Sequence, residues 1–220
     1  KHVYFETNKG DAMDLSALKL LDVETGKTEL VESDPLKRAD LGAVTFSEVT
    51  DDLALTTYTD ERTRRYFHDK ALESDYKWLQ GKLPGKEIGF GSRTTDERVW
   101  VVSARSDTEP AETYVYDRKA KTLVLQYRLF EKLPRQSLAS MKVVKYKSSD
   151  GLEIPAYLTL PKGVPEKGLP LLVIPHGGPW ARDNWGYNSL AQFFANRGYA
   201  VLMPNFRGST GYGKKFLNAG

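Results

Sequence analysis

Residues 171–180 read LLVIPHGGPW and residues 205–213 read NFRGSTGYG, and together these two stretches decide the fold class. The first continues an apolar run over residues 169–175, and the second follows another apolar run over residues 199–204. Runs that are apolar on both faces are typical of strands in the middle of a sheet. The second half of the chain is therefore predicted to contain two buried strands, each followed by a glycine-rich loop.

A helix is predicted between these two strands, over residues 189–197. Asn188 or Ser189 can cap its first turn, and Gly198 ends it. Its expected apolar face carries Leu190, Phe193 and Phe194. Strand, loop, helix and strand in this order predict the alternation of an α/β sheet.

The paired glycines Gly177 and Gly178 are candidate catalytic residues through their backbone N–H groups. Acyl transfer needs donors aimed at the oxygen that becomes negative in the tetrahedral intermediate, and a glycine leaves its N–H open to approach. In α/β-hydrolases the loop after a central strand supplies one such donor. A tight turn with positive φ would favour two glycines equally well. The sequence leaves open which N–H would point inward.

Other residues of the two loops receive expected roles. His176, Trp180 and Arg182 are expected to contact substrate, although aromatic and ionic side chains on loops often only pack. His176, at the end of a strand, is expected to orient the loop by hydrogen bonding and not to act as a general base. Arg207 is expected to anchor the second loop through a carboxylate or carbonyl groups.

Ser209 is tested as a nucleophile and rejected. Its context, residues 207–211, reads RGSTG, which lacks the first glycine of the GxSxG nucleophile elbow and follows the wrong strand. GxSxG does not occur in the 220 residues.

The first half of the chain contains a repeat. Three strand pairs share a polar turn and end in Asp22, Asp69 and Asp117, which are 47 and 48 residues apart. The first strands of the pairs are predicted at residues 3–7, 53–58 and 99–103. This period fits β-propeller blades, which run about 40–50 residues each. An ordinary β-sandwich with accidental spacing is the alternative.

The middle unit carries an insertion over residues 69–83, predicted to be a short helix packed on a blade. Its expected apolar face carries Ala71, Leu72, Tyr76 and Leu79. Two to three blades cannot close a propeller of ~4–8 blades, so further blades are expected from outside these residues. The chain alone would expose strand edges.

The pattern changes in a segment with Pro134 and little periodicity, which indicates a crossing between domains. A hairpin follows, with strands over residues 141–147 and 152–160. The predicted domains are a partial, all-β propeller of about three blades at residues 1–133, a linker at 134–140, and the N-terminal part of an α/β-hydrolase domain at 141–220.

The composition excludes several function classes. Lys and Arg number 32 against 29 Asp and Glu, for a formal net charge of +3, with no block of like charge. Nucleic-acid and membrane partners are therefore not expected. Without cysteine, thiolate nucleophiles and cysteine-built metal sites are excluded. The three histidines are far apart, so no metal is expected, and no cofactor is called for.

No apolar run approaches the roughly 18 residues that span a bilayer, so the chain is expected to be soluble. It opens on a strand-like segment without a signal peptide. The compartment stays open, because a cleaved signal would lie upstream.

The two glycine-rich stretches, with DGLEIPAYL at residues 150–158, resemble the prolyl oligopeptidase family in its acylaminoacyl-peptidase and dipeptidyl-aminopeptidase branch. The resemblance covers residues 140–220 closely, and the family would place propeller blades before them.

This resemblance implies a Ser-Asp-His peptidase that cleaves short peptides, with the propeller screening access and the Gly177/Gly178 loop contributing to the oxyanion hole. It also implies that the nucleophile, aspartate and histidine follow in chain order beyond Gly220. The 220 residues alone are therefore expected to be inactive. Expected partners are short peptides, the remainder of the same polypeptide and, as an open alternative, a second copy of it.

Two other functions stay open. A carboxylesterase of the same fold would usually carry a third glycine where this chain has Pro179, and it would not follow propeller blades. A propeller scaffold with a decayed hydrolase domain would bind peptides without cleaving them.

Overall fold

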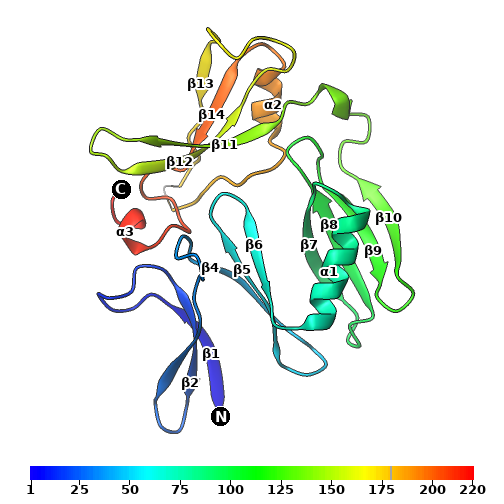
Figure 1. Cartoon of the computed structure of the whole chain (residues 1–220), viewed down its shortest axis with the longest axis vertical. Helices are drawn as coiled ribbons and strands as arrows, with labels where there is room; N and C mark the ends of the chain where they lie inside the picture. Colours follow the sequence, from blue (N-terminus) through cyan, green and yellow to red (C-terminus); the bar gives the residue numbers. More distant parts are fainter. Residues whose placement is uncertain (179) are drawn as a thin grey trace.

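The computed structural model describes residues 1–178 and 180–220, and these form four separate sheets (Figure 1). Three come from the first half, and each is an antiparallel meander. Sheet A contains β1 (His2–Thr7), β2 (Ala17–Asp22) and β3 (Thr28–Glu32). Sheet B contains β4 (Leu41–Phe46), β5 (Leu53–Thr59) and β6 (Thr63–Phe67). Sheet C contains β7 (Glu87–Arg93), β8 (Val99–Arg105), β9 (Glu112–Asp117) and β10 (Thr122–Arg128).

The predicted repeat is present, but the second and third predicted units each begin one strand after the true first strand of the sheet. The strands predicted to open the second and third units are β5 and β8, and β4 and β7 precede them. The missed strands contain glycines that lie against hydroxyl groups of the neighbouring strand, where a side chain would collide with the hydroxyl oxygen. A Cβ on Gly42 would lie 2.8 Å from Thr57 Oγ1, and one on Gly89 would lie 2.6 Å from Ser103 Oγ. Glycine weakens a strand pattern, so the sequence concealed both strands.

The predicted insertion helix is α1 (Lys70–Lys82), which Asp69 caps by accepting from two backbone N–H groups. Leu72 and Leu79 pack it against the cores of sheets B and C. The prediction was wrong for Ala71, which is exposed. Asp75 occupies the buried face instead, because it finds hydrogen-bond donors on sheet C.

Sheet D belongs to the second half, and its strand order is β11-β12-β14-β13. The strands are β11 (Met141–Lys147), β12 (Glu153–Thr159), β13 (Leu171–Val173) and β14 (Ala200–Pro204). The predicted hairpin is β11 and β12, and β13 pairs parallel with β14. In Figure 1 this sheet lies above the three others. Two helices accompany it, α2 (Ser189–Ala195) and α3 (Lys214–Leu217), and the 3₁₀ helix η1 (Arg135–Ser137) lies before it.

Two predictions for this half need correction. β13 was expected in the middle of the sheet, but it is a short strand at the edge of the described sheet, and Leu171 and Val173 are more than half exposed. α2 buries Ala191, Gln192 and Ala195, whereas Leu190 and Phe193 are about half exposed. Small alanine side chains let the helix approach β14 closely, and of the three predicted residues only Phe194 packs against this core.

The blades contact the second half at the start of α3. Asp14 Oδ1 accepts from Lys215 N at 2.7 Å, and Asp40 Oδ2 accepts from Gly213 N at 3.0 Å. A second contact lies at the other end of the interface, where Gln192 Nε2 donates to Asp107 O at 3.2 Å. None of the helices in residues 1–178 and 180–220 is long and apolar enough to cross a membrane.

Candidate functional site

The two glycine-rich loops follow the parallel neighbours β13 and β14, so they emerge at the same end of sheet D. His176 joins them. Its Nε2 lies 2.7 Å from Ser209 Oγ, its Nδ1 lies 2.9 Å from Gly177 O, and its ring stacks on Phe206 with centroids 4.4 Å apart. His176 therefore holds the first loop in place from both ring nitrogens.

The backbone of Gly177 and Gly178 is exposed, and neither N–H has an acceptor in the described part of the chain. The surroundings would accommodate a Cβ at one of the two glycines and not at the other. A Cβ on Gly177 would meet open space. Gly178 has φ +145°, and its Cβ would lie 2.8 Å from Trp180 N. Both N–H groups thus have no acceptor among the described residues, and their role as oxyanion donors stays a prediction.

Ser209 is fully buried, and its Oγ lies 2.6 Å from Phe206 O as well as beside His176. A hydroxyl without solvent access and with both directions occupied cannot reach a substrate carbonyl. This geometry supports its rejection as a nucleophile.

The predicted substrate-contact residues lie in different environments. His176 is half-buried, as just described, and Trp180 is 76% exposed. Arg182 points toward the blades, where Nη1 donates to Thr59 O and Nη2 donates to Asp60 O, both at 2.7 Å. Most of its donors are thus used within the protein. Substrate contact by these three residues stays a prediction.

Asp183 is held by the side chain of Asn205, which is fully buried. Asn205 Oδ1 accepts from Asp183 N at 2.7 Å, and Asn205 Nδ2 donates to Asp183 O at 3.0 Å. The Asp183 carboxyl has a buried Oδ2 without a hydrogen-bond partner among residues 1–178 and 180–220. Burial raises the pKa of this carboxyl. Sequence reasoning missed Asn205, although its place directly after a buried strand is a usable signal.

Arg207 lies beside the turn between β11 and β12. Its Nη2 donates to both carboxylate oxygens of Asp150, at 2.9 and 2.8 Å, and to Ser148 Oγ at 3.0 Å. Hydrogen bonding from Arg207 lowers the pKa of Asp150 to about 2. This contact agrees with the expected anchoring through a carboxylate.

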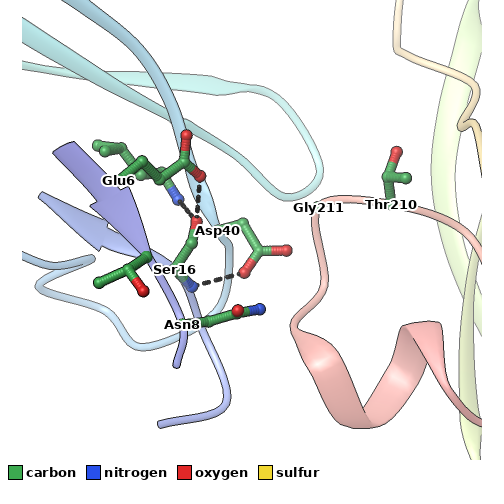
Figure 2. Close-up of a pocket in the computed structure, with 8 residues that line it drawn as sticks. Glu6, Asn8, Ser16, Asp40, Thr210 and Gly211 are labelled. Carbon is green, nitrogen blue, oxygen red and sulfur yellow. Dashed lines mark hydrogen bonds between the residues drawn. The ribbon is translucent and has the colours of Figure 1, made fainter. Parts of the chain in front are cut away.

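A cavity of about 480 Å³ lies between sheet A and the second loop. Its polar lining includes Glu6, Asn8, Ser16, Asp40 and Thr210, which Figure 2 shows together with Gly211. Ser16 organises one wall, because its Oγ donates to Glu6 at 2.6 Å and its N donates to Asp40 at 2.8 Å. Nothing in the sequence pattern singled these residues out, since they come from ordinary strands and turns far apart in the chain.

No group of three or more His, Cys, Asp or Glu side chains that could hold a metal occurs within the described residues. The residue predicted to separate a carboxylesterase from a peptidase, Pro179, lies outside them.

Comparisons with known proteins agree with this arrangement. The sequence profile described as "Prolyl oligopeptidase family" matches residues 185–220. Dipeptidyl aminopeptidase BIII of Pseudoxanthomonas mexicana is 37% identical over 227 residues, covering 100% of this chain and 32% of that protein. The chain thus spans about a third of that relative's length.

Two solved structures share the fold. A Mycobacterium tuberculosis puromycin-hydrolyzing peptidase has a TM-score of 0.73 at 17% identity, covering 100% of this chain and 34% of the other. Pyrococcus horikoshii acylaminoacyl peptidase has a TM-score of 0.61 at 20% identity, covering 98% and 32%. The predicted fold class, partial propeller blades followed by the front of an α/β-hydrolase domain, is confirmed.

Proposed function

We propose that this chain, which belongs to the prolyl oligopeptidase family, supplies access-controlling blades and an oxyanion loop to a serine peptidase. The proposed enzyme cleaves short peptides through an acyl-enzyme. In this proposal residues 1–133 are propeller, 134–140 link the domains, and 141–220 begin the hydrolase domain. One observation carries the proposal: the backbone N–H groups of Gly177 and Gly178 have no acceptor among the described residues, and they lie on the loop that follows β13, the parallel neighbour of β14.

The chemistry follows from where negative charge develops. Attack on a peptide carbonyl turns its oxygen into an oxyanion, and donors fixed in advance stabilise it without reorganising. Gly177 and Gly178 supply such donors, and His176 fixes their loop by its bonds to Ser209 and to Gly177 O. Loss of one oxyanion donor typically lowers kcat by about 10²–10³-fold. We place the nucleophile outside residues 1–220, because they contain no GxSxG.

Labelling of the full-length gene product with a fluorophosphonate probe tests this function. The adduct is then located by peptide mass spectrometry. We expect it on a serine within GxSxG and beyond Gly220. An adduct on Ser209 would overturn the site assignment, and no adduct on a folded protein would favour the peptide-binding scaffold. Cleavage of esters without cleavage of peptides would favour a carboxylesterase.

A further inference from the structure

The turn between β5 and β6 is joined to the oxyanion loop by a continuous chain of hydrogen bonds. It begins in sheet B, where the carbonyls of Thr59 and Asp60 accept from Arg182. Arg182 Nη2 also donates to Tyr212 Oη at 2.8 Å, and Asn205 Nδ2 donates to the same hydroxyl at 2.7 Å. The Tyr212 hydroxyl thus accepts two hydrogen bonds, one from each side.

The chain of contacts continues into the first loop. Asn205 pairs with both the N–H and the carbonyl of Asp183. Asp183 lies five residues after Gly178 in the sequence. The backbone that carries the oxyanion donors is therefore fixed at one end by His176 and near the other by Asn205.

The space around Arg182 is built for a guanidinium group. A Cβ on Gly211 would lie 2.6 Å from Arg182 Nη1, so a side chain at this position would displace the guanidinium. The guanidinium also lies over the Tyr212 ring, with Cζ 4.5 Å from the centroid. Burial raises the pKa of Tyr212 to about 12, which keeps its hydroxyl neutral. Arg182, Gly211 and Tyr212 thus pack closely together at the place where sheet B meets the two glycine-rich loops.

We infer that Arg182 is a positioning residue, through which the turn between β5 and β6 sets the place of the oxyanion donors. The inference rests on the proposed function. It goes further because the blades then belong to the catalytic scaffold and do more than screen access. An arginine suits this role, since its planar fork reaches two carbonyl oxygens in fixed directions.

The test uses the full-length protein and a small chromogenic peptide that needs no screening. We expect Arg182→Met to lower kcat by about 10²-fold, as for a misplacement near 1 Å, with KM changed by less than about threefold. Tyr212→Phe should lower kcat by about 10-fold, and the double variant should be no worse than Arg182→Met alone. Arg197→Met is the matched control with unchanged kcat, because among the described residues the Arg197 side chain hydrogen-bonds only Phe193 O, within its own helix region.

Hydrogen exchange gives a readout that needs no activity. Peptides covering residues 174–186 and the turn between β5 and β6 should exchange faster in Arg182→Met and in Tyr212→Phe than in the wild type, while sheet C should not change. Unchanged kcat with unchanged exchange in Tyr212→Phe would overturn the inference, even if Arg182→Met failed to fold. A wild-type protein that does not react with the fluorophosphonate would instead overturn the proposed function. Exchange would then still decide whether Arg182 holds the loop.

Discussion

The blades and the hydrolase part use buried carboxyl groups in opposite ways. Asp34, Asp75 and Glu112 in the blades are at most 3% exposed, and each accepts hydrogen bonds from cationic side chains. Burial alone would raise their pKa, but these hydrogen bonds prevail and lower it. In the hydrolase part, the buried oxygen of Asp183 has no such partner among residues 1–178 and 180–220, and burial raises the pKa of this carboxyl.

The difference shows that ion pairing stabilises the interiors of the two parts unequally. Buried carboxylates with several donors fix the blades, and removing one leaves the cations without a partner. In the hydrolase part, Asn205 and the Arg182 guanidinium hold the first loop through backbone groups, and Arg207 holds the second loop through the exposed carboxylate of Asp150. The cations there bond carbonyl oxygens and an exposed carboxylate, and not a buried one.

The largest expected effect comes from Asp34→Ala. Asp34 accepts from Nη1 and Nη2 of Arg64, at 2.6 and 2.8 Å, and from three backbone N–H groups. We expect the free energy of unfolding of the blades to fall by about 3–5 kcal/mol, measured by urea unfolding of the full-length protein. Asp183→Asn is the matched control, with no loss of stability. A larger loss in Asp183→Asn than in Asp34→Ala would remove the contrast between the two parts.

Gly178→Ala should have the next largest effect, on catalysis and not on the blades. The substitution places a Cβ 2.8 Å from Trp180 N at φ +145°, which displaces the loop. We expect kcat of the full-length protein to fall by about 10²–10³-fold. Gly177→Ala should cost less, because its Cβ meets open space. The reverse order would mean that the donor at Gly177 dominates.

Acid should weaken the blades first. Asp34 has a pKa of about 2 in the folded protein against an ordinary 3.8, so the folded state binds its proton more weakly. The stability from Asp34 is complete above pH 5 and is lost as the pH falls toward 2, about 2 kcal/mol in all. Asp183 acts in the opposite direction, because its raised pKa means that protonation relieves the folded state.

Unfolding curves between pH 7 and pH 3 measure this difference. Asp34→Asn should flatten the loss of stability with falling pH, and Asp183→Asn should leave the loss in place. Equal slopes in the wild type and in Asp34→Asn would show that Asp34 is not the group responsible.

The smallest expected effect is that of Ser209→Ala. A buried hydroxyl bonded to His176 and Phe206 O contributes about 1 kcal/mol of stability, and its loss should lower kcat by less than about 10-fold. Steady-state kinetics and fluorophosphonate labelling check this together. Complete loss of labelling would make Ser209 the nucleophile and would give the hydrolase part a reactive group within residues 1–220.

The sequence predicts local patterns better than it predicts partners. The apolar runs before the two glycine-rich loops and the 47-residue spacing of Asp22 and Asp69 identify the fold class. Strands such as β7 were missed because Gly89 makes room for Ser103 on a neighbouring strand, which no local pattern records. The partners of Arg182 are carbonyl oxygens more than 120 residues away, and every residue has a carbonyl. Its bridging contact is therefore a property of the folded chain alone.

Arg135 makes the crossing between the two parts rigid, so that the crossing does not act as a flexible linker. Its Nε donates to Glu109 Oε1 at 2.9 Å. Its guanidinium nitrogens also bond the carbonyls of Leu129, Phe130 and Leu133. If the two parts rotate relative to each other about this rigid crossing, atoms near the crossing move little and atoms far from it move a long way. In Figure 1, α2 lies on the same side as this crossing and α3 lies on the opposite side; α2 carries Gln192, which contacts Asp107, and α3 contacts Asp14. Any swing of the two parts is thus expected to separate α3 from Asp14 before it disturbs Gln192.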